Sequence, residues 1–393
     1  MAMVVIVGWQ VYDLARTDYG MTPKVASFQL GLLGLAQFVP FLLLTPVAGW
    51  AADRFERRTV ARLANSIDIV VTLGLGWLTW QEQLSLPLLF SLAALHGMAR
   101  VFVGPSMSAI APNIVPPAAL PRAIAMNSIA WQSGSVLGPA IGGIVYATSP
   151  SAPYWLIVLL LLVANVAMSF IPPVHPPQQA TASHPLRQMV EGLTYCWKER
   201  FLLGTITLDL FAVLLAGATA LLPVYARDIL HAGPDGLGLL RAAPGVGAAI
   251  VALWLSIRPI QRNVGVIMLG SVVAFGVWTI AFGLSRNFTL SMSALALLGA
   301  TDMLSVFIRS SLIQLNTPDS MRGRVGAVSG LAISASNELG ELQSGTAAAL
   351  MGPVAAVVFG GAGAILITAI WSRLFPELKN ARTFAPIYRE EKS

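Results

Sequence analysis

Three stretches of this sequence carry no lysine, arginine, aspartate or glutamate, and each is longer than one membrane span. They run between Lys24 and Asp53, between Arg122 and Arg187, and between Glu341 and Arg373. A helix of about 20 apolar residues crosses a hydrocarbon core of about 30 Å, where only helices and closed barrels satisfy their backbone hydrogen bonds. Because the apolar runs are continuous rather than alternating, the sequence predicts membrane-spanning helices.

Composition supports the same fold class. Hydrophobic residues make up 56% of the chain and charged residues only 11%, with a mean hydropathy of +0.72. A soluble domain carries about 25% charged residues because its surface faces water. The surface of this protein is therefore expected to face lipid, and the expected fold is an all-α integral membrane protein.

Turn and charge signals divide the chain into eleven complete spans. These are 27–52, 60–80, 86–110, 122–148, 153–171, 201–226, 236–256, 264–284, 289–314, 324–350 and 353–374. The segment from Met1 to Ala15 reaches only about 20 Å as a helix, too short to cross alone. We expect it to be part of a truncated first transmembrane helix. A signal peptide is the alternative, but the segment lacks a basic start and a small-residue cleavage pattern.

The basic residues predict the topology. One set of alternate loops and the C-terminal tail contain Arg54, Arg57, Arg58, Arg62, Arg122, Arg187, Lys198, Arg200, Arg258, Arg262, Arg322, Arg324, Arg373, Lys379, Arg382, Arg389 and Lys392. The other set contains only Arg16, Lys24, Arg227 and Arg286. The positive-inside rule places the richer set, with the C-terminus, in the cytoplasm. The net charge of +6 reflects this asymmetry, so we expect no nucleic-acid partner.

The chain reads as two repeated halves. A shift of 202 positions aligns Leu95 with Leu297, Gly97 with Gly299, Ser108 with Ser310, Pro116 with Pro318, Arg122 with Arg324, Leu137 with Leu339, Gly138 with Gly340 and Gly143 with Gly345. Parallel repeats of this kind are a transporter architecture. We predict a transmembrane bundle over 1–171, a cytoplasmic linker with an interfacial helix over 172–200, a second bundle over 201–375 and a cytoplasmic tail over 376–393.

A charged motif follows the first complete span. It consists of Gly49, Asp53, Arg54, Arg57 and Arg58. It resembles the G-x-x-x-D-[RK]-x-G-R-[RK] loop signature of the major facilitator superfamily, with Glu56 in place of the second glycine. The resemblance implies a major facilitator fold of two six-helix bundles. Gly49 would permit close helix approach and the charges would form a conformational latch. An ordinary positive-inside loop is the alternative.

A glycine-rich motif lies in the span 122–148. It contains Gly134, Gly138, Pro139, Gly142 and Gly143. It resembles the G-x-x-x-G-P-x-x-G-G signature of the antiporter, or exporter, branches of the superfamily. Glycines four apart share a helix face and allow another helix to approach, and Pro139 bends the span. A generic helix contact is the alternative interpretation.

Ionisable residues inside the predicted spans are candidates for proton coupling or ion pairing. They are Asp68, Arg100, Asp209, Asp302, Arg309, Glu338 and Glu341. A charge at membrane depth is costly unless it faces a cavity or a partner. Arg100 and Gly104 also resemble a superfamily motif in which the arginine is tied to proton transfer, and Asp302 occupies the repeat position of Arg100. Structural polar pairs and proton carriers both remain open, with Asp13 and Asp68 in reserve.

Several segments identify a narrower resemblance, to the enterobactin-exporter-like branch, also called transmembrane secretion effectors. They are Gly8 to Leu14, Gly34 to Leu44, Leu221 to Leu230, Asn316 to Val325 and Ser336 to Gly345. The resemblance extends over essentially the whole chain. It implies export of a small molecule, siderophore-like or drug-like, from a bacterial cell through the inner membrane.

No sequence pattern indicates catalysis. There is no GxxxxGK[ST] nucleotide loop, no His and Cys cluster and no GxSxG elbow, and Cys196 is the only cysteine. We therefore expect neither an enzyme nor a cofactor or metal site, but a monomeric transporter with a small-molecule substrate, protons and the lipid bilayer as partners. The alternatives are an importer or facilitator on the same fold and a non-transporting membrane sensor.

Overall fold

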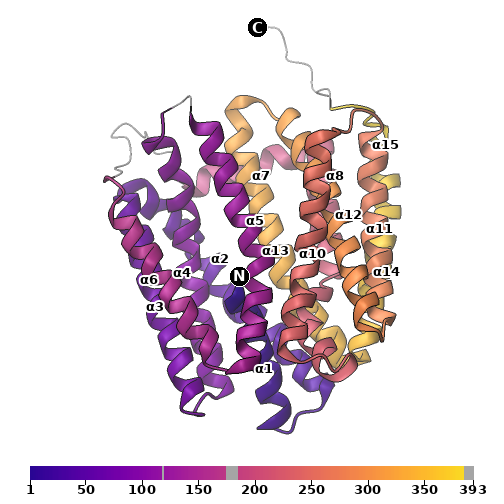
Figure 1. Cartoon of the computed structure of the whole chain (residues 1–393). Coiled ribbons are helices and arrows are strands. Elements are labelled where there is room, and N and C mark those ends of the chain that lie inside the picture. The colour runs from indigo at the N-terminus through magenta and orange to yellow at the C-terminus, as the bar shows by residue number, and fades with distance from the viewer. Residues whose placement is uncertain (117–118, 174–184, 385–393) are drawn as a thin grey trace. The chain divides into compact units, whose positions relative to one another are not determined.

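The structure, a computed structural model, describes residues 1–116, 119–173 and 185–384, and this part of the chain contains helices and no β-strand (Figure 1). The helices before the linker are α1 (Ala2–Thr17), α2 (Pro23–Arg54), α3 (Arg57–Trp80), α4 (Leu86–Ile114), α5 (Leu120–Thr148) and α6 (Ala152–Ser169). Those after it are α7 (Pro185–Lys198), α8 (Arg200–Leu215), η2 (Ala218–Leu221), α9 (Leu222–Val224), η3 (Tyr225–Ile229), α10 (Gly233–Ile257), α11 (Val264–Leu284), α12 (Phe288–Leu315), α13 (Asp319–Met351), α14 (Pro353–Leu374) and α15 (Pro376–Asn380).

Among the described residues, nine helical segments are long and apolar enough to cross a membrane. They are Pro23–Thr45, Arg57–Trp80, Leu86–Gly104, Ala152–Ser169, Arg200–Ile229, Gly233–Ile257, Val264–Leu284, Phe288–Leu315 and Pro353–Leu374. The helices expected over 122–148 and 324–350 are present as α5 and α13, but neither belongs to this set, so their crossing of the membrane stays a prediction. The predicted all-α membrane fold is confirmed.

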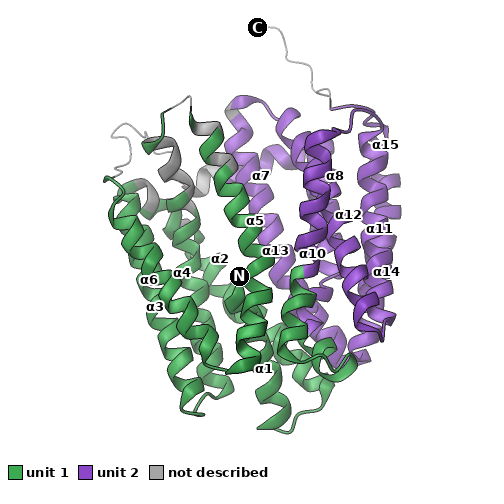
Figure 2. Cartoon of the chain, in the orientation of Figure 1, with its two compact units in different colours: residues 1–185, 223–242 green, residues 186–222, 243–393 purple. Residues whose placement is uncertain are grey.

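The chain divides into two compact units (Figure 2). Unit 1 contains Met1–Pro185 and Pro223–Ala242, and unit 2 contains Leu186–Leu222 and Ala243–Ser393. The segment from Pro223 to Ala242 follows the linker in sequence yet packs within unit 1. The predicted bundle boundaries at 171 and 201 describe the repeat, and they stay a prediction.

Repeat-related glycines stand at equivalent helix contacts. In unit 1, a Cβ added at Gly97 of α4 would lie 2.7 Å from the backbone oxygen of Gln37 in α2. In unit 2, a Cβ at Gly299 of α12 would collide with the backbone of Pro244 in α10. The shift of 202 positions therefore relates two helix pairs of the same kind, each closed at a position where only glycine leaves room for the neighbouring backbone.

The expected continuous helix over 201–226 is interrupted. α8 ends at Leu215, and after Ala216 and Gly217 the chain continues as a 3₁₀ turn, a short α-helix and the π-helical turn η3. Pro223 has no N–H for the carbonyl four residues earlier, which disfavours a regular α-helix here. Gly217 lies against α13, where an added Cβ would be 2.7 Å from the Gly340 oxygen. The segment Arg200–Ile229 still qualifies as one membrane span, but its helix is not a regular α-helix throughout.

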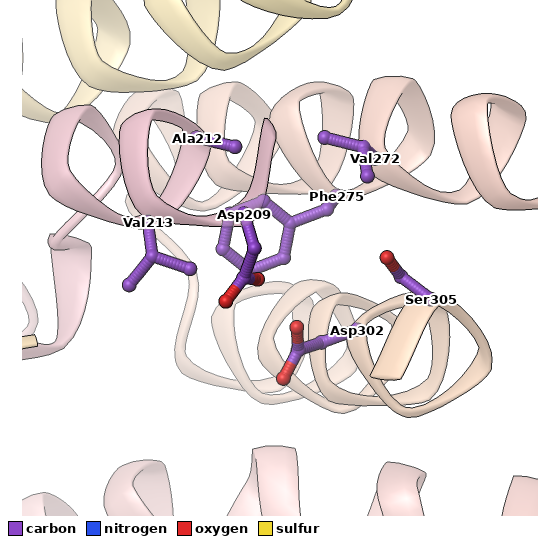
Figure 3. Close-up of a pocket in the computed structure, with 7 residues that line it drawn as sticks. All are labelled: Asp209, Ala212, Val213, Val272, Phe275, Asp302 and Ser305. Carbon is purple, nitrogen blue, oxygen red and sulfur yellow. The ribbon is translucent and has the colours of Figure 1, made fainter. Parts of the chain in front are cut away.

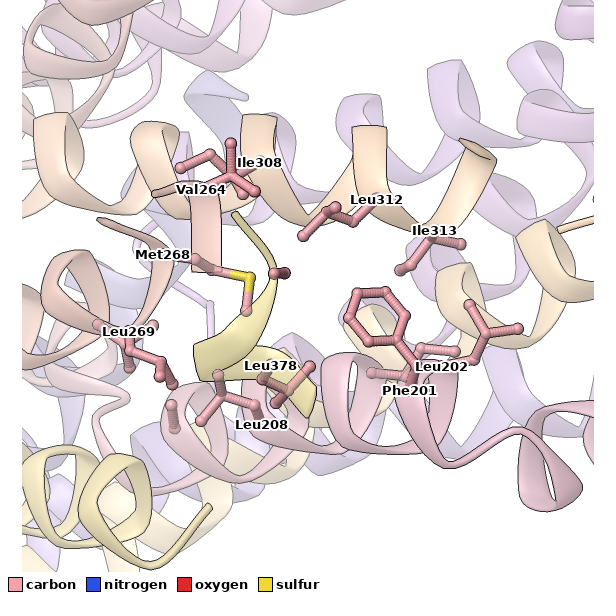
Figure 4. Packing of buried hydrophobic residues seen from close by; sticks show 14 of the residues in the cluster. Phe201, Leu202, Leu208, Val264, Met268, Leu269, Ile308, Leu312, Ile313 and Leu378 are labelled. Carbon is pink, nitrogen blue, oxygen red and sulfur yellow. The ribbon is translucent and has the colours of Figure 1, made fainter. Parts of the chain in front are cut away.

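Unit 2 has a hydrophobic core built by α8, α11, α12, α13 and the short α15 (Figure 4). Leu202, Leu208, Met268, Leu312 and Leu378 are at most 2% exposed. The Gly265 N–H donates to the Ala381 carbonyl at 2.9 Å, which fixes α15 against the start of α11. This core leaves little room for a polar side chain, so the charged groups of α8 and α12 must find partners nearby.

Candidate functional site

The centre of the candidate site is a buried ion pair in unit 2. Asp209 lies in the middle of α8 and Arg309 lies in α12, and their whole-residue exposures are 8% and 5%. The Arg309 guanidinium donates from Nη1 to Asp209 Oδ1. An isolated charge is costly at this depth, so each group is needed to keep the other charged.

A second carboxylate stands beside this pair. Asp302 lies two helical turns before Arg309 in α12, is partly buried, and interacts electrostatically with both Asp209 and Arg309. Asp209 and Asp302 face the same small pocket (Figure 3). Its other lining residues are Ala212, Val213, Val272, Phe275 and Ser305.

The chemistry of this cluster follows from its charges. One guanidinium balances one carboxylate, so two ionised carboxylates leave one negative charge in excess. Binding of one proton, or of one cationic group of a ligand, makes the cluster neutral. Such a three-group site titrates as a unit rather than residue by residue. The pocket gives the excess charge a place to meet a water molecule.

The other predicted ionisable residues lie elsewhere. Glu338 and Glu341 are partly buried on α13, three residues apart and therefore on one face of that helix. Arg100 is exposed on α4 of unit 1, and its charge acts on the amino group of Met1. The sequence set is thus divided between two units, and among the described contacts only Asp209, Asp302 and Arg309 form one cluster.

The sequence analysis missed a polar network in unit 1 that joins α1 to the π-helical turn η3. Tyr12 donates to Asp228 at 2.6 Å, Arg16 pairs with Asp228 at 3.3 Å, and Arg227 pairs with Asp13 at 2.6 Å. Tyr12 is fully buried. The signal was available, since Tyr12 and Asp13 lie in the segment Gly8 to Leu14, and Arg227 and Asp228 lie in the segment Leu221 to Leu230. Both segments carry the family resemblance. The pairing itself spans more than half of the chain and left no local pattern.

The sequence analysis named Asp68 but missed its partner, a histidine. Asp68 of α3, noted above as ionisable, lies 2.7 Å from Nδ1 of His96 in α4. The Asp68 and His96 side chains are each 13% exposed. A histidine inside the apolar span 86–110 was the available signal.

Comparison with known proteins identifies the family. Residues 1–341 match the sequence profile of the Major Facilitator Superfamily. The chain belongs to the major facilitator superfamily. It is 28% identical over 376 residues to the enterobactin exporter of Citrobacter koseri, covering 92% of this chain and 87% of the relative. It is 27% identical over 370 residues to the enterobactin exporter of Escherichia coli K12, covering 92% and 86%. The predicted resemblance to this branch is confirmed.

Solved structures show the same superfamily fold. A POT family transporter in complex with 5-aminolevulinic acid aligns with a TM-score of 0.73 at 13% identity, over 96% of this chain and 93% of that one. The D-xylose-proton symporter aligns with a TM-score of 0.68 at 13% identity, over 96% and 98%. Family and fold together make this chain a multi-pass membrane transporter of a small molecule.

The superfamily loop motif has an altered pairing here. Glu56, at the position usually held by glycine, lies 2.9 Å from the Arg58 guanidinium, and Arg58 also donates to the Ile171 carbonyl at 2.6 Å. Arg54 lies over the Trp50 ring, 5.7 Å from its centroid. Arg57 is partly buried, and the Asp53 side chain lies outside the described residues. A Cβ added at Gly49 would meet nothing within 4 Å in the described part of the chain, so the expected close approach is not seen at this residue.

The superfamily exporter motif packs α5 on two neighbours within unit 1. A Cβ at Gly138 would lie 3.0 Å from Met1, and one at Gly142 would lie 3.0 Å from Ala2, both in or next to α1. A Cβ at Gly143 would lie 2.8 Å from Gly238 of α10. Pro139 lies inside α5, and its carbonyl is the nearest neighbour of a Cβ at Gly238. Gly134 has open space in the described part of the chain.

Proposed function

We propose that this transporter exports a small, siderophore-like or drug-like molecule across the bacterial inner membrane in exchange for protons, acting as a monomer. The observation that carries the proposal is the cluster of Asp209, Asp302 and Arg309 at a cavity between apolar spans. Its excess carboxylate is a proton-accepting group at membrane depth. The enterobactin exporters among the relatives and the packed glycines of α5 support the outward direction.

Proton binding and substrate release would alternate at this cluster. A proton that enters from outside neutralises the excess charge, and opening toward the cytoplasm exposes the carboxylates so that the proton leaves. Asp302 is the better carrier because Asp209 is already held by Arg309. Arginine stays protonated in proteins, so Arg309 is a fixed positive charge beside both carboxylates and favours their ionised form.

The deciding experiment measures transport into proteoliposomes that contain the purified protein inserted inside-out. Enterobactin is the first member of the substrate panel. An acidic lumen should drive uphill accumulation, and collapse of the pH gradient should end it. Accumulation driven by the opposite gradient would favour the importer. Correctly inserted protein that gives neither flux nor binding with any member of the panel would favour the sensor.

We also propose that the loop motif is a conformational latch, with Asp53 as its acidic member beside Arg54, Arg57 and Arg58. Asp53→Asn removes one charge and leaves the apolar spans unaltered, so transport should fall while membrane insertion stays normal. Asp319→Asn is the matched control, because Asp319 is exposed and, among the described residues, its ion pair is with Arg322 three residues later. Unchanged flux in Asp53→Asn would reduce the motif to a topology signal.

The proposed orientation places the C-terminus in the cytoplasm. Arg16 and Arg227, assigned by their loops to the opposite side, lie in one network in unit 1, as residues on the same side must. A reporter enzyme fused after Ser393 should be located in the cytoplasm. A reporter located in the periplasm would reverse the proposed topology.

A further inference from the structure

Unit 1 contains its own buried ionisable pair, separate from the cluster in unit 2. Asp68 in α3 and His96 in α4 meet at 2.7 Å between Oδ1 and Nδ1. Both helices are apolar enough to cross a membrane, and both side chains are 13% exposed. An aspartate and a histidine at such depth are costly unless they are paired or used.

The surrounding helices hold the pair in place. A Cβ at Gly97, next to His96, would lie 2.7 Å from the Gln37 backbone oxygen, so α4 and α2 are in close contact beside the imidazole. On α3, the Thr72 hydroxyl donates to the Asp68 carbonyl at 2.7 Å, one turn along the helix. The imidazole is thus positioned by backbone contacts that leave little freedom to α4.

His96 also has access to open space. It lines a small pocket together with Met3, Val4, Val7, Gln37 and Ala93. Of these neighbours only Gln37 has a side chain that both donates and accepts hydrogen bonds. His96 therefore has one polar neighbour at this pocket, Gln37, in addition to Asp68.

The charges around the pair come from several elements. On α4, Arg100 lies one helical turn after His96. On α3, Arg62 donates to Asn165 of α6 at 3.4 Å. α2 contributes the neutral Gln37 at the cavity.

We propose that the Asp68 and His96 pair is a second proton-binding site of this protein. With His96 protonated the pair is neutral overall, and with His96 neutral it carries the single charge of Asp68. An unperturbed histidine changes charge between about pH 5 and about pH 8, which is why the proposal assigns the proton to the imidazole. The proposal concerns proton binding itself and does not depend on the direction of transport.

The test is an NMR titration of the full-length protein in nanodiscs, with ¹⁵N-labelled histidine, from about pH 5 to about pH 9. The chain has four histidines, so His175→Gln, His184→Gln and His231→Gln assign the His96 signals by elimination without altering the pair. We expect the His96 ring to change from the doubly protonated to the neutral form within this range. A ring that stays in one form throughout would overturn the proposal.

A variant separates a proton site from a merely structural pair. Asp68→Asn keeps the shape of the side chain and removes its charge, so the midpoint of the His96 titration should move by about one pH unit or more. His231→Gln is the matched control, because His231 is exposed and bonds only to the Arg227 carbonyl among the described contacts. A His96 midpoint that is the same in Asp68→Asn and wild type would show that the two groups are not coupled. If Asp68→Asn does not fold, the wild-type titration still decides.

Discussion

Among the described residues, each unit holds a buried aspartate beside a basic side chain, and the two basic side chains differ in kind. In unit 2, Asp209 is held by Arg309, with side-chain exposures of 10% and 7%. In unit 1, Asp68 is held by His96, with 13% for each. Arginine never loses its proton in a protein, whereas histidine does so near neutral pH. Burial is similar, so the difference in chemistry teaches that the pair in unit 2 contains a permanent cation, whereas the pair in unit 1 contains a base that can be neutral.

The largest expected effect comes from breaking the permanent pair. Arg309→Gln leaves the Asp209 carboxylate buried without its cation and should lower the free energy of unfolding by about 3–5 kcal/mol. Adding Asp209→Asn removes the unpaired charge and should restore most of this loss. The measurement is thermal unfolding of the purified single and double variants. Equal stability of the two would contradict the pairing.

Exchanging the cations would test the comparison directly. Arg309→His should make unit 2 depend on pH, because an imidazole is charged and paired in acid and neutral in alkali. The thermal stability of Arg309→His should therefore be higher at about pH 5 than at about pH 9, by about 2 kcal/mol. His96→Arg replaces the imidazole by a permanent cation. It should remove the pH dependence of thermal stability that the Asp68 and His96 pair contributes. If the thermal stability of both variants and of wild type changed with pH in the same way, the proposed roles of Arg309 and His96 would be wrong.

Removing the unbalanced carboxylate should affect function more than stability. Asp302→Asn leaves the Asp209 and Arg309 pair intact, so the free energy of unfolding should change by less than about 1 kcal/mol. Gradient-driven transport in reconstituted vesicles should be abolished, while downhill exchange and substrate binding remain. Ser305→Ala, which alters a neighbour on the same cavity, is the matched control. Full uphill transport by Asp302→Asn would exclude it as a proton carrier.

The smallest effect is expected at the loop pair of Glu56 and Arg58. These side chains are only 20% and 19% exposed, but Arg58 keeps a second partner in the Ile171 carbonyl. Glu56→Gly, which restores the usual motif residue, should cost about 0.5–1 kcal/mol. Transport in vesicles should stay within about twofold of wild type. If Glu56→Gly lowered the free energy of unfolding as much as Arg309→Gln, the loop pair would be as important for stability as the buried pair.

Helix positions and the family were predictable because they depend on local composition and on contiguous motifs. The uncharged stretches located α2, α5 and α14, and the glycine spacing in α5 indicated a close contact before its partner, α1, was known. The pairings were not predictable. Asp209 and Arg309 were both singled out, but their meeting depends on how α8 and α12 are rotated about their axes, which apolar composition does not specify. His96 was overlooked because a single polar residue hardly changes the hydropathy of a span.

The division of unit 1 into two separated segments has a consequence for biosynthesis. The ribosome releases Met1–Pro185 first, and Pro223–Ala242 follows only after part of unit 2 has been made. Until then Tyr12, Asp13 and Arg16 of α1 lack the partners that Arg227 and Asp228 later provide. The nascent first half must therefore remain in the membrane as an unfinished assembly. A chain that stalls before Arg227 would present Asp13 and Arg16 without these partners.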